Sequence, residues 1–318
     1  MCSHYYILAV TLTKINTMKF LITGATGLVG NELVALLLSK QHTVHYLTTS
    51  KDKIKELPNY VGFYWNPQEG KIDESCIYGV DVIVHLAGAN IANRWTKAYK
   101  QEIIESRTLT SDLLFKLVKK TPNQVKQLIS ASGTAIYPES TIKVYDESTT
   151  ESEDSFLSNV VKKWEESVTP FHMLGIKVCK LRTGIVLSNK GGALPEMVKP
   201  IRFGFGAVMG SGEQIQSWIH LHDLANLYRF AAEQQLEGIY NAVSPLPVSN
   251  AAMTKAIAKV LKKPLWLPSV PEFVMKLVLG EMAYLLFSSK NLSSHKIKEA
   301  GFEFEFEELD KALVSLYA

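Results

Sequence analysis

Cysteine is scarce in this chain of 318 residues, and the three that occur, Cys2, Cys76 and Cys179, stand far apart. An odd, scattered set excludes a disulfide framework and a CxxC metal site, and it is typical of a reducing compartment. Charge of one sign is also scarce, because 34 basic and 31 acidic side chains leave a net charge of only +3. That excess is too small to indicate nucleic acid as a partner. We therefore expect a cytoplasmic protein that binds no nucleic acid.

Long apolar runs are missing too. The longest, from Val274 to Phe287, contains a lysine and a glutamate and is shorter than the ~20 residues that a bilayer-spanning helix needs. We predict an amphipathic helix there and no membrane partner. No basic residue precedes Lys14, so the beginning of the chain resembles neither a signal peptide nor a mitochondrial presequence. We interpret residues 1–17 as a leader extension and Met18 as the functional start.

Composition and length indicate a globular protein. Apolar residues make up 47% and charged residues 20% of the chain, which excludes disorder, collagen and coiled coil as descriptions of the whole. The length is roughly twice that of a typical domain of about 150 residues. Such a chain buries enough surface to fold without disulfides or metals. We expect one large α/β domain with an appendage, or two domains.

Short apolar runs alternate with helical patterns from Lys19 onward. Strands are predicted at residues 19–23, 43–47, 80–87, 127–131 and 177–182. Helices are predicted at residues 31–39, 96–119 and 156–174, the last interrupted near Pro170. Strands that alternate with helices indicate a parallel sheet covered on both faces. The acidic stretch 146–154 is interpreted as a solvated loop.

The alternation weakens after Gly184, where glycine and proline gather between residues 191 and 212. Two later helices are predicted at residues 251–261 and 272–287. We therefore predict a first domain at residues 18–185 and, at 186–318, a smaller substrate-side lobe with a C-terminal helical domain. Crossover connections are free to return part of the second lobe to the first sheet.

Three glycines stand between the first predicted strand and the first predicted helix, in the sequence Gly24-Ala25-Thr26-Gly27-Leu28-Val29-Gly30. Gly24 permits a tight turn, Gly27 lets the backbone approach a pyrophosphate, and Gly30 lets the helix pack closely on the strand. The helix N-terminus offers free N–H groups to phosphate oxygens. We predict that this turn binds a dinucleotide in a Rossmann-type, doubly wound parallel sheet. The alternative is that the glycines only shape a turn.

The end of the second predicted strand bears on the choice of cofactor. It reads Leu47-Thr48-Thr49-Ser50-Lys51, with no carboxylate before Asp52. NAD-binding proteins usually place an acid about 20 residues after the turn, where it holds the ribose 2′-hydroxyl. Hydroxyls and a lysine suit a 2′-phosphate instead, which a carboxylate would repel. We favour NADP(H) over NAD, with Thr48, Thr49 and Lys51 near the 2′-phosphate. The alternative is that Lys51 is an ordinary surface lysine.

The spacing GxxGxxG, together with His85-Leu86-Ala87-Gly88 after a later strand, resembles the short-chain dehydrogenase/reductase superfamily, especially its extended, epimerase-like members. Further motifs occur in the order of one atypical branch: Arg94-Trp95, Ser106-Arg107, Lys163-Trp164-Glu165, Leu181-Arg182-Thr183-Gly184, Gly191-Gly192-Ala193-Leu194, Ser217-Trp218-Ile219-His220 and Gly280-Glu281-Met282-Ala283. That branch comprises NAD(P)-dependent epimerase-family proteins that end in a domain of unknown function. The resemblance extends from about Met18 to Leu316.

The resemblance implies a Rossmann fold and NADP(H) binding. It implies that Leu86, Ala87 and Gly88 pass beneath the adenosine, and that Arg94 and Arg182 lie near the cofactor or substrate. The alternative for each arginine is a structural ion pair. Relatives carry Ser-Arg against the 2′-phosphate where this chain has Thr48-Thr49, so the arginine is missing and Lys51 is its candidate substitute.

The catalytic pair of the superfamily is also missing. Active members carry Tyr-x-x-x-Lys on one helix face, where the lysine lowers the pKa of the tyrosine for proton transfer. None of the thirteen tyrosines here is followed four residues later by lysine. Leu157 and Val161 occupy the expected positions. Ser132 is the candidate for holding the substrate oxygen and Tyr137 for a displaced acid. The alternatives are a serine bonded to local backbone and a packing tyrosine.

Taken together, these features predict an NADP(H)-binding epimerase- or oxidoreductase-like protein that acts on a small hydroxyl or carbonyl compound, nucleotide sugars included. The alternative is a catalytically lapsed NADP(H)-binding redox sensor or interaction module, which the missing pair favours. The sequence His220-Leu-His222-Asp223 lacks the third converging soft ligand that zinc needs, so no metal site is predicted. The sequence leaves the substrate and the oligomeric state open.

Overall fold

A computed structural model describes residues 17–318, so nearly all of the predicted leader at 1–17 lies outside the described residues. The strands are β1 Lys19–Thr23, β2 Thr43–Thr48, β3 Glu56–Leu57, β4 Tyr60–Asn66, β5 Lys71–Ile72, β6 Val82–His85, β7 Gln127–Gly133, β8 Lys177–Thr183, β9 Ile185–Leu187, β10 Ile215–Gln216, β11 Trp218–His220, β12 Gly238–Ala242 and β13 Val248–Ser249. The helices are α1 Leu28–Ser39, α2 Lys97–Lys120, α3 Phe156–Val168, α4 Ala193–Arg202, α5 Leu221–Glu233, α6 Asn250–Val260, α7 Glu272–Leu279, α8 Tyr284–Phe287, α9 His295–Glu299 and α10 Leu309–Tyr317. Short 3₁₀ helices include η1 Lys51–Lys53, η4 Thr134–Ile136, η5 Thr169–Leu174 and η6 Gly280–Ala283.

A nine-stranded sheet forms the centre of the molecule, with the order β12-β8-β7-β6-β1-β2-β4-β3 and β5 paired to β4. Its main strands are parallel, and only β3 and β5 run antiparallel to β4. The chain moves from β1 to β2 on one side and returns to β6 on the other side of β1. This reversal of strand order is the switch point at which doubly wound sheets bind ligands. The predicted Rossmann-type fold is confirmed.

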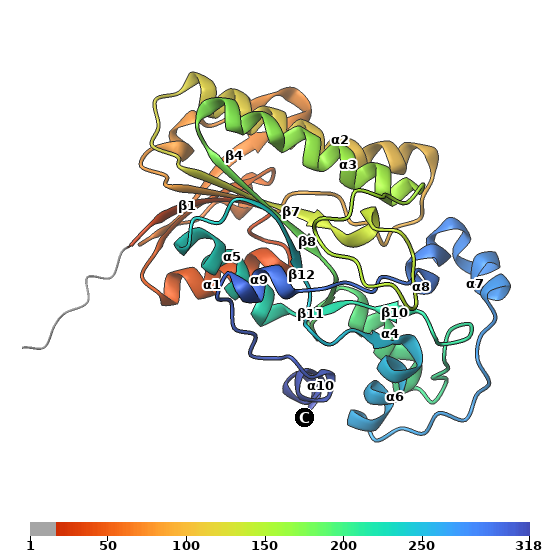
Figure 1. Cartoon of the computed structure of the whole chain (residues 1–318). Helices are drawn as coiled ribbons and strands as arrows, with labels where there is room; N and C mark the ends of the chain where they lie inside the picture. Colours follow the sequence, from red (N-terminus) through yellow and green to blue (C-terminus); the bar gives the residue numbers. More distant parts are fainter. Residues whose placement is uncertain (1–16) are drawn as a thin grey trace, which may run out of the picture.

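Helices cover both faces of this sheet (Figure 1). α1 and α5 pack together on one face, and α2 and α3 pack together on the other. Each face buries an apolar core: Leu33 and Leu37 of α1 belong to one, and Leu114 and Leu117 of α2 belong to the other. The i, i+4 and i, i+3 spacings of these leucines place each pair on the buried side of its helix.

A smaller lobe follows β8. α4, α6 and α10 enclose a separate apolar core around Trp218. Two small sheets join β9 to β11 and β10 to β13. The chain nevertheless returns twice to the first sheet, because α5 packs on α1 and β12 pairs in parallel with β8, with Tyr240 opposite Leu181.

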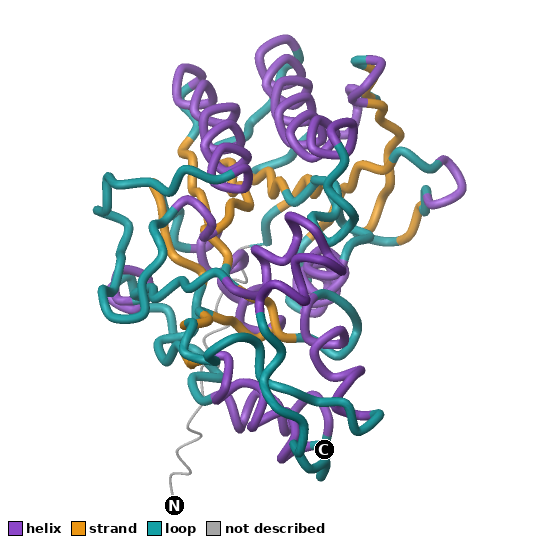
Figure 2. The backbone as a smooth tube through the Cα atoms, turned by 90° about the vertical axis from the view of Figure 1, so that its right-hand side faces the viewer, coloured by secondary structure: helices purple, strands orange, loops and turns teal. Residues whose placement is uncertain are grey.

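The carboxyl ends of the parallel strands meet at one edge of the large sheet. Thr23 of β1 lies opposite His85 of β6, and Gly133 of β7 lies opposite Thr183 of β8. Figure 2 shows the backbone turned by 90° from Figure 1, with helices above and below the strands and the smaller lobe beneath them. The candidate site residues gather along this edge.

Candidate cofactor site and active site

The glycine turn after β1 has a shape that only glycine permits at two positions. Gly24 has a φ of +70°, in the left-handed region. A Cβ atom built on Gly30 would lie 2.2 Å from the carbonyl oxygen of Gly24, so no side chain fits there. The N–H of Gly27 donates to that same carbonyl oxygen at 3.0 Å. The turn is therefore closed tightly against the beginning of α1.

The first turn of α1 has the features of an anion-binding site. Within residues 17–318, no side chain caps this helix and no acidic residue stands in its first turn. Gly27 is its N-cap residue and is exposed. Unpaired N–H groups and the positive end of the helix dipole favour phosphate oxygens. The residues present fit the diphosphate of a dinucleotide.

The glycine turn touches the second cofactor motif. A Cβ on Gly24 would lie 3.0 Å from the carbonyl carbon of Leu86 and 3.1 Å from the nitrogen of Ala87. The backbone N–H groups of Leu86 and Ala87 both donate to the hydroxyl oxygen of Thr23, each at 3.1 Å. That hydroxyl also lies 2.7 Å from Nδ1 of His85. The side chain of Thr23 therefore links the end of β1, where the glycine turn begins, to the predicted cofactor loop at residues 86–88.

A buried histidine supports this junction. Because the Thr23 oxygen already accepts two N–H groups, its own proton is directed to Nδ1 of His85, and the histidine carries its proton on Nε2. Nε2 faces the hydroxyls of Ser111 at 3.2 Å and Thr110 at 3.3 Å, on α2. Burial lowers the pKa of His85 to about 4, so the ring is neutral at ordinary pH. The sequence analysis missed Thr23 and His85 as supporting residues, although His85 begins the second motif.

The end of β2 carries the residues predicted for the 2′-phosphate. Thr48 is buried, and its hydroxyl accepts the N–H of Ser50 at 3.2 Å. Thr49 and Lys51 are exposed. The Lys51 ammonium lies 5.1 Å from the ring centre of Tyr64. The Thr48 side chain is therefore engaged locally, whereas Thr49 and Lys51 are accessible from solvent.

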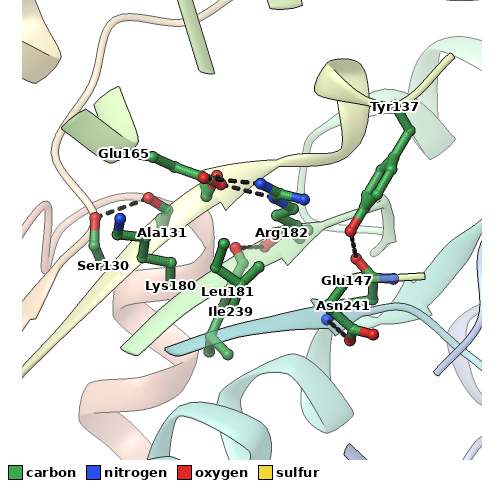
Figure 3. A network of polar contacts seen from close by, with 12 residues as sticks. Ser130, Ala131, Tyr137, Glu147, Glu165, Lys180, Leu181, Arg182, Ile239 and Asn241 are labelled. Carbon is green, nitrogen blue, oxygen red and sulfur yellow. Dashed lines mark hydrogen bonds and ion pairs between the residues drawn. The ribbon is translucent and has the colours of Figure 1, made fainter. Parts of the chain in front are cut away.

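A buried charged cluster lies where β7 and β8 end (Figure 3). The hydroxyl of Ser132 donates to Oε1 of Glu165 at 2.6 Å. Arg182 donates two hydrogen bonds to the same carboxylate, from Nε to Oε1 at 2.8 Å and from Nη2 to Oε2 at 2.9 Å. Burial raises the pKa of Glu165, but the hydrogen bonds and charge of Arg182, with the bond from Ser132, outweigh it and hold the pKa below its usual range. Glu165 is ionised, and the lone pairs of Ser132 remain available to a donor.

Tyr137 is part of the same polar network. Its hydroxyl donates to Oδ1 of Asn241 at 2.8 Å, and the backbone N–H of Asn241 donates to Glu147 at 2.6 Å. The guanidinium of Arg182 lies 4.9 Å from the Tyr137 ring centre. Lys290 donates to the Tyr137 carbonyl oxygen at 2.7 Å. Burial raises the pKa of Tyr137 to about 12 despite Arg182, so this phenol keeps its proton at ordinary pH.

The helix positions expected for the missing catalytic pair are apolar and packed. Leu157 and Val161 of α3 are both buried. A Cβ on Gly133 would lie 3.2 Å from a methyl carbon of Val161, so this face of α3 rests on the end of β7. Glu165 follows Val161 by one more helical turn and shares its face. Glu165 was not predicted as a site residue, although its partners Ser132 and Arg182 were. The signal that could have identified it is a carboxylate on an otherwise apolar helix stripe.

The predicted residues fall into three groups and one outlier, and one group is Thr48, Thr49 and Lys51 at the end of β2, described above. The first group is the glycine turn with the second motif: Gly24, Thr26, Gly27, Leu28, Val29, Gly30, Leu86, Ala87 and Gly88. The second group is Ser132, Tyr137 and Arg182, which Glu165 and the Arg182–Tyr137 stacking connect. Arg94 is exposed in the loop before α2.

Two cavities lie beside this edge and share Glu281 as a lining residue. One of about 390 Å³ is lined by Trp95, Phe156 and Lys100, and one of about 510 Å³ is lined by Tyr284. An ion pair joins Lys100 of α2 to Glu281 of η6. Both cavities are therefore lined partly by the large domain and partly by the α7–α8 region of the smaller lobe, and none of the predicted site residues lines either of them.

Neither a metal centre nor a membrane span is found in the described part of the chain. No group of three or more histidine, cysteine, aspartate or glutamate side chains within residues 17–318 is arranged to hold a metal ion. Over the same residues, no helix has the length and apolar character needed to cross a membrane.

Comparison with known proteins agrees with this geometry. The model of the NAD dependent epimerase/dehydratase family matches residues 20–242, and a domain of unknown function (DUF1731) matches residues 270–316. Epimerase family protein YfhF of Bacillus subtilis is 35% identical over 302 residues, which cover 95% of this chain and 98% of the relative.

Two solved structures are similar over nearly the whole chain. The crystal structure of human epimerase family protein SDR39U1 (isoform 2) with NADPH has a TM-score of 0.82 and 30% identity, and covers 94% of this chain and 99% of that one. A nucleoside-diphosphate sugar epimerase from Corynebacterium glutamicum has a TM-score of 0.76 and 30% identity, and covers 95% of this chain and 59% of that one.

Proposed function

Because this chain belongs to the NAD dependent epimerase/dehydratase family, we propose that it binds NADP(H) and acts as an oxidoreductase or epimerase on a small hydroxyl or carbonyl compound. The observation that carries the proposal is the junction of the glycine turn with the second motif at Gly24. The uncapped first turn of α1 stands beside that junction and suits a diphosphate.

The preference for NADP(H) rests on two observations. Hydroxyl groups and Lys51 follow β2, with no carboxylate before Asp52 to repel a 2′-phosphate. The human relative, at 30% identity, was crystallised with NADPH. Lys51 is the candidate that replaces the arginine expected from the family pattern.

For the reaction, the bound nicotinamide would supply or accept a hydride at ring C4. Ser132 directs its own proton to Glu165, so its oxygen can accept a hydrogen bond from a substrate hydroxyl. Arg182 keeps Glu165 ionised and fixes its orientation. Tyr137 is the second candidate beside the substrate. Its raised pKa keeps the phenol protonated at ordinary pH, so it can donate a hydrogen bond but does not act as a base. Nucleotide sugars are candidate substrates because a 30% identical relative is described as a nucleoside-diphosphate sugar epimerase.

One observation favours a second function. Leu157 and Val161 are buried side chains that cannot transfer protons, and they stand where active superfamily members carry the Tyr-x-x-x-Lys pair. A protein that binds NADP(H) without turnover, as a redox sensor or interaction module, would have the same glycine turn. Turnover separates the two functions, since both require cofactor binding.

Cofactor binding is tested by titrating NADPH and NADH while following nicotinamide fluorescence. We expect NADPH to bind more tightly than NADH. Lys51→Ala should weaken the binding of NADPH and leave the binding of NADH unchanged. Gly27→Val should raise the NADPH dissociation constant at least about tenfold, or about 1.4 kcal/mol. Ala193→Val, at the exposed start of α4, is the matched control. Failure of the wild type to bind either dinucleotide would refute both functions.

Turnover is tested in three assays: small carbonyl compounds for NADPH oxidation, small hydroxyl compounds for NADP+ reduction, and nucleotide sugars for an epimerised product. The third assay follows the product because an epimerase returns the hydride to its substrate and leaves the cofactor unchanged overall. We expect Ser132→Ala to lower the rate with little effect on NADPH affinity, and Tyr137→Phe to lower it less. Activity that neither substitution changes would contradict the assigned site. NADPH binding with no turnover on any compound would favour the sensor.

A further inference from the structure

Two arginines are buried near the carboxyl edge of the sheet, and only one has a charge partner. Arg107 is 8% exposed and Arg182 is 6% exposed. Arg182 forms a two-point ion pair with Glu165. Arg107 forms no ion pair with any carboxylate of residues 17–318. A buried charge without a partner is strongly unfavourable, so its retention calls for a ligand of opposite charge.

The guanidinium of Arg107 is incompletely bonded. Nη1 donates to the carbonyl oxygen of Ile103 at 2.8 Å, and Nη2 reaches that of Ala89 at 3.3 Å. Nε has no hydrogen-bond partner in the described structure, nor has Nε1 of Trp164. The guanidinium lies 4.7 Å from the Trp164 ring centre. Burial lowers the pKa of Arg107 to about 10, which still leaves the group positively charged at neutral pH.

The position of this charge relates it to the second cofactor motif. A Cβ built on Gly88 would lie 3.0 Å from Cζ of Arg107, so the guanidinium rests against the backbone there. Two residues earlier, the same segment packs against Gly24 of the glycine turn, where a Cβ built on Gly24 would lie 3.0 Å from the carbonyl carbon of Leu86. The segment 86–89 therefore contacts both Arg107 and the turn that suits a diphosphate.

We propose that Arg107 is the buried cation of the dinucleotide site, left without a carboxylate so that the diphosphate of the bound cofactor neutralises it. This inference rests on the proposed NADP(H) binding. Because Arg107 is buried, water screens its charge less than that of an exposed side chain, so the charge can act on a phosphate at the neighbouring turn. A carboxylate beside Arg107 would cancel the attraction, as Glu165 does for Arg182.

The test compares Arg107→Met, which removes the charge at similar volume, with Arg107→Lys, which keeps it. We expect Arg107→Met to raise the NADPH dissociation constant at least about tenfold, or about 1.4 kcal/mol, and Arg107→Lys to raise it much less. Without cofactor, Arg107→Met should resist urea at least as well as the wild type, because an uncompensated buried charge has gone. Arg229→Met, whose arginine pairs with Glu233 on α5, is the control for loss of an arginine elsewhere.

A second probe identifies the phosphate concerned. 2′-AMP lacks the diphosphate, so Arg107→Met should bind it as the wild type does. An equal loss for 2′-AMP and NADPH would overturn the assignment to the diphosphate. Unchanged NADPH affinity in Arg107→Met, or equal losses in the Met and Lys variants, would overturn the inference while wild-type NADPH binding still supports the proposed function. If Arg107→Met fails to fold, Arg107→Gln, which removes the charge but keeps N–H donors, replaces it in the same comparison.

Discussion

The hydroxyl of Thr23 lies 2.7 Å from Nδ1 of His85, where β1 and β6 end side by side. These two strands flank the point at which the strand order reverses. The contact connects the loop that suits the cofactor diphosphate to the loop predicted to pass beneath the adenosine. This contact and the parallel pairing of β1 with β6 together hold the two predicted cofactor loops side by side, although the loops are about sixty residues apart in the sequence.

Replacing Thr23 by valine should loosen that junction. The variant keeps the shape of the side chain but leaves the N–H of Ala87 and Nδ1 of His85 without their partner. The N–H of Leu86 keeps a bond to the backbone carbonyl oxygen of Thr23 at 3.2 Å. A buried group left unpaired costs about 1–3 kcal/mol, so we expect a loss of that size in the free energy of unfolding, measured with urea. NADPH affinity should fall as well. Thr43→Val on β2 is the control, and equal losses in both variants would contradict a special role for Thr23.

Stability should depend on pH through His85. The pKa of His85 in the folded protein is about 4, below the ordinary value of 6.5. Between these two pH values His85 is therefore protonated in the unfolded chain and neutral in the folded chain. The contribution of His85 to stability is therefore full above pH 6.5 and is lost as the pH falls towards 4, by about 3 kcal/mol at most. His220, whose pKa burial also lowers to about 4, adds in the same direction.

The measurement is urea unfolding at several pH values in that window. His85→Gln should be less stable at neutral pH. Below pH 6.5 its free energy of unfolding should fall less steeply with pH than that of the wild type, by the slope that corresponds to about one bound proton. His295→Gln, an exposed histidine on α9, should keep the wild-type slope. A slope that His85→Gln leaves unchanged would show that His85 does not titrate as proposed.

Much of the large sheet could be predicted from the sequence. β1, β2, β6, β7 and β8 are short apolar runs between helical patterns, and the structure confirms each of them. β12, Gly238–Ala242, was not predicted, because it has no distinctive apolar run, and its place is set by pairing with β8. Tertiary pairing of this kind leaves no local signal.

The part of the site that could be predicted consists of residues that lie next to one another in the sequence. The glycine turn and the second motif are contiguous stretches, so their residues could be named in advance. Glu165 was found only through its partners, since Ser132 and Arg182 stand 33 and 17 residues away in the sequence. Residues 146–154 form a largely exposed loop, as expected, but Glu147 and Glu153 are partly buried and accept bonds from Asn241 and Lys290. Such contacts depend on how distant segments meet.

Gly30→Ala should destabilise the protein although alanine favours helices. The added Cβ would lie 2.2 Å from a backbone oxygen of Gly24, and that backbone must shift to make room. The strain of overpacking, about 1–3 kcal/mol, exceeds the gain in helix propensity of about 1 kcal/mol. Gly133→Ala is the matched control, because its Cβ meets only a methyl carbon of Val161 at 3.2 Å. Equal stability of the two variants in urea would contradict the close approach at Gly30.

The ion pair of Glu165 with Arg182 should behave as one unit. Glu165→Leu leaves a buried arginine without its partner, and Arg182→Met leaves a buried carboxylate, so each change should lower the free energy of unfolding by about 3–5 kcal/mol. In the double variant both charges are gone, and its loss should be much smaller than the sum of the single losses. Urea unfolding of the four proteins measures this coupling. Additive losses would mean that the two side chains contribute to stability independently, which would contradict their action as one unit.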